Sequence, residues 1–238
     1  MEELKNHFSD IERAISYAFK NKQLLITAFT HRSFMNENRE IVSEHNERLE
    51  FLGDAVLTLI ISDFLFHHLP LTREGDLSHL RAQLVDAAAC AAFIQKLNVH
   101  SYILLGKGEL LAGGKGRESI FSDLFEAILG AIYLDGGMEA SRKFVLEHFM
   151  QDILHTIEKP SKNWKAELQD YAQKNYQQIP LYRVMKEEGP DHQKIFYVSV
   201  ILNEKELGKG TGTSKKKAEQ EAAKDALEKN LGIADGES

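Results

Sequence analysis

The spacing of apolar residues divides the chain into two parts. Up to about residue 157, apolar residues recur every three or four positions, which is the period of an amphipathic helix. This pattern predicts helices over residues 11–19, 23–29, 47–69, 76–97, 120–133 and 138–157. Pro70, the glycine-rich stretch 106–116 and the run Asp135-Gly-Gly are typical of chain breaks between them. We therefore expect an all-α domain over residues 1–157.

The pattern changes after residues 158–162, whose charges and proline are typical of a short linker. A helix is predicted over residues 164–176, and residues 194–202 then alternate with the period of two that indicates a β-strand. Residues 181–187 and 205–212 are expected to flank that strand, and a last helix is predicted over residues 214–230. Helix, three strands and helix predict a small α+β (α-β-β-β-α) domain over residues 163–232.

Composition and charge limit the classes of protein that the chain can represent. Its 238 residues are 43% hydrophobic, which is enough for two domains with cores of their own. Residues 1–160 hold 16 basic and 23 acidic side chains and so the whole net charge of −7, whereas residues 161–238 hold 13 of each. We therefore expect the two parts to have different tasks.

The single cysteine, Cys90, excludes an internal disulfide framework and a cysteine-based zinc site, and its alanine-rich surroundings predict a small core residue. The first residues show no signal-peptide pattern, and no window approaches the roughly 18 apolar residues of a membrane span. We expect a cytoplasmic protein that does not enter a membrane.

Several acidic residues lie at positions where the helical spacing of apolar residues predicts a buried core. Glu47, Glu50 and Asp54 form one stripe of an otherwise apolar helix, and the stripe is either solvated or covered by a cation. Asp123 and Glu126, three residues apart in another apolar helix, are harder to explain by exposure. If the two helices face each other, their oxygens converge.

Oxygen ligands without a nearby cysteine select Mg²⁺, for which Mn²⁺ can substitute, and such an ion suits phosphoryl chemistry. The glycine-rich stretch does not match a phosphate-binding loop, because Gly114 and Gly116 stand where that motif needs Lys and Ser or Thr. We therefore expect no nucleotide cofactor.

Four motifs in order resemble the ribonuclease III family. They are Glu47-Arg-Leu-Glu-Phe-Leu-Gly-Asp-Ala-Val-Leu57, Glu74-Gly-Asp-Leu, Ser119-Ile-Phe-Ser-Asp-Leu-Phe-Glu-Ala-Ile-Leu-Gly130 and Tyr133-Leu-Asp-Gly-Gly137. The resemblance implies a homodimeric, Mg²⁺-dependent endonuclease domain that cuts double-stranded RNA to 5′-phosphate and 3′-hydroxyl ends, with roles in rRNA and mRNA processing.

The resemblance also implies roles for particular residues. Glu50, Asp54, Asp123 and Glu126 would bind the metal, with Asp54 and Glu126 as catalytic residues. Glu47 and Glu74 would lie nearby in supporting roles, and Phe51 would insert into the partner subunit. Thr30-His-Arg-Ser33 matches a further family block, for which we expect a structural role.

The second domain carries a lysine cluster, Lys215, Lys216 and Lys217, in the first turn of its last helix. Lysines there oppose the helix dipole, each at a cost of roughly 0.3–1 kcal/mol. The cost is offset if phosphates bind at that turn; the alternative is an ordinary solvated cluster.

The order of elements in this domain resembles the double-stranded-RNA-binding domain. That resemblance implies contacts to two successive minor grooves and to the phosphates between them. The matching positions are Gln169, Gln173, His192, Lys215, Lys216 and Lys217. Trp164 and Tyr171 are expected to pack in the core or against the linker, because the bases of a duplex are not exposed for stacking.

Two functions of different classes remain open from the sequence. The first is a Mg²⁺-dependent endoribonuclease, which we favour because no carboxylate of the family pattern is missing. The second is a non-catalytic dimer that binds double-stranded RNA and uses the acidic stripe only to shape an interface. A general Mg²⁺ phosphohydrolase of small substrates is disfavoured by the duplex-binding domain.

Overall fold

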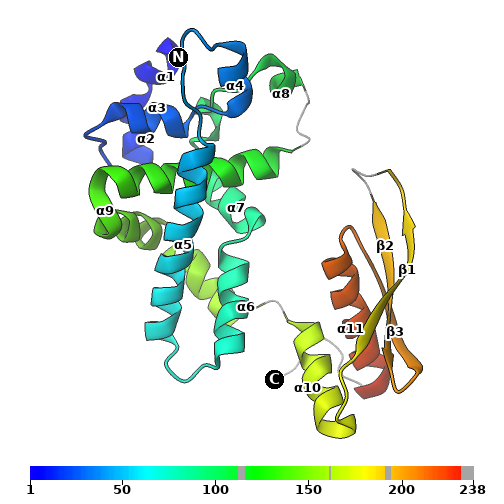
Figure 1. Ribbon diagram of the computed structural model, residues 1–238. Helices are drawn as coiled ribbons and strands as arrows, with labels where there is room; N and C mark the ends of the chain where they lie inside the picture. The colour runs from blue at the N-terminus through cyan, green and yellow to red at the C-terminus, as the bar shows by residue number, and fades with distance from the viewer. Residues whose placement is uncertain (112–115, 161, 191–193, 232–238) are drawn as a thin grey trace. The chain divides into compact units, whose positions relative to one another are not determined.

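The computed structural model describes residues 1–111, 116–160, 162–190 and 194–231. The chain divides into two compact units, Met1–Pro160 and Ser161–Ser238. The first is helical and the second has the order helix, three strands, helix, so the predicted fold class is confirmed (Figure 1). The domain boundaries at residues 157 and 163 and the linker role of residues 158–162 stay predictions. None of the helices within the described residues is long and apolar enough to cross a bilayer.

Nine α-helices and one 3₁₀ turn make up the described part of the first unit. They are α1 (Glu2–Asn6), α2 (Phe8–Ala14), α3 (Lys22–Ala28), α4 (Arg32–Glu37), α5 (Glu47–His68), α6 (Glu74–Leu84), α7 (Ala87–Leu97), η1 (His100–Tyr102), α8 (Lys107–Leu111) and α9 (Arg117–Glu158). Figure 1 shows α5 crossing the first half of α9. Apolar faces of α5, α7 and α9 supply much of a core that includes Ile60, Phe93 and Phe125.

Two predicted helices and one predicted break need correction. The helix expected over residues 11–19 ends at Ala14, because the backbone at Ser16 is left-handed with φ of 54°. The helix expected over residues 76–97 is two helices, because Asp86 has extended backbone and its side chain caps α7 by accepting a 2.8 Å hydrogen bond from Ala89 N. The glycine-rich stretch contains the short helix α8; residues 112–115 lie outside the described residues.

The break expected at Asp135-Gly-Gly is confirmed as a kink within α9. Gly137 has φ of 78°, a conformation that side chains disfavour, and the chain changes direction there. Asp135 accepts hydrogen bonds from Tyr17 Oη (2.7 Å), Lys20 N (2.9 Å) and Asn21 N (2.9 Å). The kink is thereby fixed to the segment that joins α2 and α3.

Two glycines allow the backbones of α5 and α9 to touch. A Cβ atom at Gly53 of α5 would lie 1.8 Å from the carbonyl oxygen of Glu126, and one at Gly130 of α9 would lie 2.2 Å from that of Leu49. Real Cβ atoms do not approach other atoms so closely, so only glycine fits at either position. The helices therefore cross at a point one turn from Glu50 on α5 and one turn from Glu126 on α9.

The second unit packs two helices on one face of a three-stranded antiparallel sheet. Its elements are α10 (Trp164–Tyr176), β1 (Leu181–Glu188), β2 (Ile195–Leu202), β3 (Lys205–Gly212) and α11 (Lys215–Leu231), with strand order β1-β2-β3. Trp164 is buried in the core and Tyr171 packs against it, as predicted. Ala222 of α11 lies against Gly210 of β3, where a Cβ would be 2.2 Å from Ala222 N. The alanine stripe of the last helix is thus its packing face.

Replacing Gly53 with Ala should lower the free energy of unfolding by about 1–3 kcal/mol or more, because the added methyl overlaps the backbone of α9. Urea unfolding of the full chain, followed by circular dichroism, measures this. The control is Gly75→Ala in α6, where no atom lies within 4 Å of the new methyl and stability should stay the same or rise slightly. A Gly53→Ala variant of undiminished stability would contradict the close crossing.

Candidate active site and RNA-binding surface

Three carboxylates converge beside the crossing of α5 and α9. They come from Glu50 in the first turn of α5 and from Asp123 and Glu126 in α9, and one oxygen of each lies within 4.8 Å of the others. All three side chains are half-buried. Residues more than 70 positions apart in sequence thus form one cluster, which we call the carboxylate cluster.

Burial and mutual repulsion favour the protonated forms of these groups. Burial raises the pKa of Glu126 to about 8, and the charges of Asp54, Glu50 and Asp123 add to the rise. Burial likewise raises the pKa of Glu50 to about 7, with contributions from Asp123, Glu47 and Asp54. The pKa of Asp123 is also raised by burial. At neutral pH the cluster therefore holds protons unless a cation offsets its charge.

The donor atoms of the cluster suit a hard divalent cation. Carboxylate oxygens are the ligands that Mg²⁺ and Mn²⁺ prefer. The Sγ atom of Cys90 lies 3.9 Å from Glu126 Oε1, but this thiol is fully buried, as predicted for a core residue. Burial raises the pKa of Cys90 far above neutrality, so in the metal-free protein its sulfur stays protonated.

The other predicted carboxylates lie at different distances from the cluster. Asp54 is exposed and outside the group of three, but it is close enough to raise the pKa of Glu126 and of Glu50. Glu47 is exposed, and its Oε1 lies 3.1 Å from Arg32 Nη1 at the start of α4. Glu74 begins α6 at the far end of α5, separated from Glu50 by roughly 25 Å of helix. Within one chain the structure does not bring Glu74 to the cluster.

Phe51 points away from the core and is 81% exposed. Leu59 and Phe66 are exposed at 55% and 67%, and helical periodicity places both on the same side of α5 as Phe51. Ala55 lies between them and is also exposed. These four residues form what we call the α5 apolar stripe, which the described residues leave open to solvent.

The predicted RNA-contacting residues of the second unit lie on two helices. Gln169 and Gln173 are exposed on α10, and Lys215, Lys216 and Lys217 are exposed in the first turn of α11. His192 lies outside the described residues. Lys215 Nζ is 3.5 Å from Glu187 Oε1 of β1 and 5.7 Å from the centre of the Phe196 ring. Local sequence gives no sign of this ion pair, because its partners are 28 positions apart.

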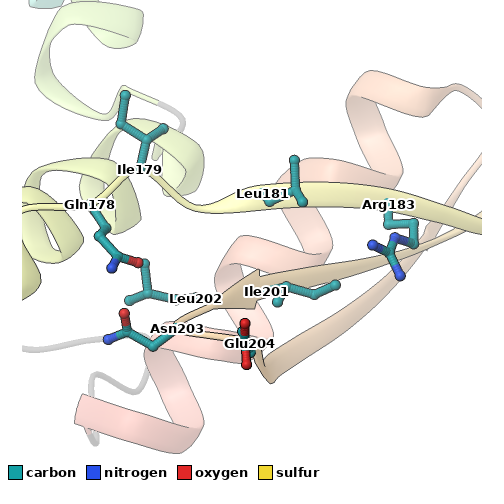
Figure 2. Close-up of a pocket in the computed structure, with 8 residues that line it drawn as sticks. All are labelled: Gln178, Ile179, Leu181, Arg183, Ile201, Leu202, Asn203 and Glu204. Atoms are coloured by element: carbon teal, nitrogen blue, oxygen red, sulfur yellow. The ribbon is translucent and has the colours of Figure 1, made fainter.

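A wide surface hollow of about 700 Å³ lies elsewhere in the second unit (Figure 2). Leu181, Arg183, Ile201 and Glu204 contribute to its lining, from β1, β2 and the turn that follows. It contains neither converging carboxylates nor the lysine cluster. The candidate chemistry therefore belongs to the carboxylate cluster and not to this hollow.

Comparison with protein families agrees with this geometry. A family model described as Ribonuclease-III-like matches residues 21–153, and a model described as the double-stranded RNA binding motif matches residues 164–230. The chain belongs to the ribonuclease III family. The resemblance inferred from the four motifs is thus confirmed.

Individual relatives in the ribonuclease III family match long parts of the chain. Ribonuclease 3 of Protochlamydia amoebophila is 59% identical over 217 residues, which are 91% of this chain and 89% of the relative. Ribonuclease 3 of Carboxydothermus hydrogenoformans is 44% identical over 94% of this chain and 96% of its own length. The solved nuclease domain of ribonuclease III from Campylobacter jejuni, 45% identical, superposes with a TM-score of 0.54 over 59% of this chain and 94% of that chain.

One segment of this ribonuclease III homologue lies closer to the cluster than its predicted structural role suggested. Arg32 pairs with Glu47, and the imidazole of His31 is near enough to Asp123 to lower the pKa of that carboxyl group, against the effect of burial. The available sequence signal was a His-Arg pair in a block that resembled the family. Only the folded structure, in which Arg32 of α4 pairs with Glu47 of α5, shows that this block lies near the cluster.

Replacing Glu126 with Gln should stabilise the metal-free protein at high pH. The raised pKa values mean that the folded state binds protons more tightly than the unfolded chain, so stability falls as pH rises from about 4.5 through 8. Removing one repelling charge should raise Tm by roughly 2–5 °C at pH 8.5 in EDTA and change it little at pH 5.

Thermal unfolding of the full chain at the two pH values measures this difference. Glu139→Gln, at an exposed position of the same helix, is the control and should leave Tm unchanged at both. If the Glu126→Gln variant and the unmodified protein have the same Tm at pH 8.5, repulsion among the carboxylates does not destabilise the folded state.

Proposed function

We propose that this protein is a metal-dependent endoribonuclease of double-stranded RNA. The observation that carries the proposal is the convergence of Glu50, Asp123 and Glu126 from two crossing helices. These residues would hold Mg²⁺, or Mn²⁺ in its place, with Asp54 as a further ligand. The ion, when bound, supplies positive charge that lowers the pKa of water and offsets charge on the phosphate oxygens.

The side chains of the site have two tasks in the proposed reaction. Glu50 and Asp123 fix the position of the ion from α5 and α9, while Asp54 and Glu126 orient the attacking water and so act as the catalytic pair. Water attacks the phosphorus in line with the 3′ oxygen, the P–O3′ bond breaks, and that oxygen takes up a proton. The products are 5′-phosphate and 3′-hydroxyl ends.

The second domain supports duplex RNA as the substrate. Duplex RNA is recognised through its shape and phosphates rather than its base edges, and exposed lysines and glutamines on α10 and α11 suit that mode. Relatives with the name Ribonuclease 3 share both domains. We propose structured precursors of ribosomal and messenger RNA as substrates, cleaved in the cytoplasm.

We further propose that the active form is a homodimer built on the α5 apolar stripe. Four exposed apolar residues along one side of a helix are typical of an interface. In the Campylobacter jejuni relative, part of the nuclease domain is involved in dimer formation. Phe51 would insert into the partner subunit, and each of the two sites would cut one strand, leaving short 3′ overhangs.

Replacing Glu126 with Gln should reduce cleavage of a duplex RNA in Mg²⁺ by roughly 100-fold or more, because a metal site contributes several kcal/mol to the barrier. Duplex binding measured in Ca²⁺ should stay within a few-fold of normal. Glu139→Gln is the control and should cut at the normal rate.

A Glu126→Gln variant that cuts normally in Mg²⁺ would refute the role of this residue. If the unmodified protein binds the duplex but yields no Mg²⁺-dependent fragments, the non-catalytic RNA-binding dimer is the better account.

Replacing Lys215, Lys216 and Lys217 together with Ala should weaken duplex binding, because fewer RNA phosphates are then neutralised. The slope of log affinity against log salt should fall by roughly one unit for each phosphate that the variant no longer binds. Filter binding of a catalytically silent Glu126→Gln background at several salt concentrations measures the slope. Lys205→Ala, at the end of β3 that lies farther from the first turn of α11, is the control. If the salt slope does not change, the three lysines are ordinary solvated residues that do not bind RNA phosphates.

A further inference from the structure

The segment Thr30–Ser33 is fixed at the edge of the carboxylate cluster by bonds on several sides. Thr30 O accepts a 2.9 Å hydrogen bond from Asn46 N, just before α5, and His31 N donates to Leu104 O at 3.1 Å. Arg32 Nη1 lies 3.1 Å from Glu47 Oε1, in the first turn of α5. The segment that carries His31 is therefore held beside the first turn of α5, in which Glu50 lies.

Hydrogen bonds on one side of the His31 ring determine where its proton lies. Nδ1 accepts a 3.2 Å hydrogen bond from Ser33 N and lies 2.7 Å from Ser33 Oγ. Ser33 Oγ in turn accepts a 2.9 Å hydrogen bond from Gly106 N, which leaves its own proton to donate to Nδ1. Because Nδ1 is an acceptor, the proton of the neutral ring is on Nε2.

A hydrogen-bond donor beside the carboxylate cluster can bind a phosphate oxygen of a nucleic acid. The ring is half-buried, and the neighbouring Arg32 pairs with Glu47 in the same turn of α5 that carries Glu50. The cluster itself offers acceptors, since carboxylates donate nothing when ionised. A phosphodiester brought to the cluster by a cation also has only acceptor oxygens. The Nε2–H group of His31 is the complementary donor.

We propose that His31 binds the RNA substrate directly, with Nε2–H donating a hydrogen bond to a non-bridging oxygen of the phosphate at the carboxylate cluster. Ser33 and Gly106 serve this contact by fixing the tautomer and the ring orientation. The inference rests on the proposed endoribonuclease function and adds a substrate-positioning residue to it. It gives chemistry to a sequence block that was expected to be only structural.

Two substitutions separate this role from helix capping. In His31→Asn, the amide oxygen takes the place of Nδ1 and can still cap α4, but no donor reaches the position of Nε2. In His31→Gln, the amide nitrogen reaches the position of Nε2 as a donor, but the cap is lost. If His31 only caps α4, His31→Asn should be the more active variant. If Nε2–H binds the phosphate, His31→Gln should be the more active one.

We expect kcat of the full-length His31→Asn variant on duplex RNA in Mg²⁺ to fall by about 10- to 100-fold, the effect of losing a hydrogen bond to a charged group. Its Tm should not change, and its duplex affinity in Ca²⁺ should fall by no more than about tenfold, the effect of one lost hydrogen bond. His31→Gln should keep kcat within about fivefold of normal while its Tm falls, because it restores the donor and loses the cap. Circular dichroism checks that each variant is folded at the assay temperature.

The inference is overturned if His31→Asn cuts at the normal rate, if both variants lose kcat equally, or if only His31→Gln loses it. These outcomes are distinct from failure of the proposed function, in which the unmodified protein gives no Mg²⁺-dependent fragments. With an active unmodified protein, the comparison of the two variants tests His31 alone.

Discussion

The candidate active site depends on the contact between the backbones of α5 and α9. Gly53 and Gly130 make the contact possible, since a methyl group at either position would overlap a carbonyl oxygen of the opposite helix. The same crossing places Glu50 one turn along α5 and Glu126 one turn along α9. A wider separation of the helices would draw their carboxylates apart. The two glycines thus determine the spacing of the acidic ligands as well as the packing of the core.

This convergence has an electrostatic cost that the fold alone does not offset. Burial and mutual repulsion raise the pKa of both Glu50 and Glu126, so the folded chain favours protons or a cation at the cluster. The first domain also repels the RNA substrate, because residues 1–160 carry the whole net charge of −7 and RNA is a polyanion. In our account, the cation and the lysines of α11 supply the attraction that the nuclease domain lacks.

The fold could be predicted well where elements are long and amphipathic, as for α5, α10 and β2. The break between α6 and α7 was missed because the apolar period runs through it, and only the capping side chain of Asp86 marks it. In the site, carboxylates in apolar helices could be identified from sequence. Which of them meet could not, because that follows from the crossing angle and depth of two helices. Gly53 and Gly130 were visible as glycines within helices, but their partners were not. The pairs Arg32–Glu47 and Lys215–Glu187 likewise join distant elements.

The central claim is that Glu50, Asp123 and Glu126 jointly bind a divalent cation at the crossing of α5 and α9. The most direct measurement is anomalous diffraction from crystals of the full chain soaked in Mn²⁺. Our account predicts an anomalous peak within bonding distance of oxygens from all three carboxylates. Manganese bound only elsewhere, or carboxylates that remain without metal at saturating Mn²⁺, would contradict it.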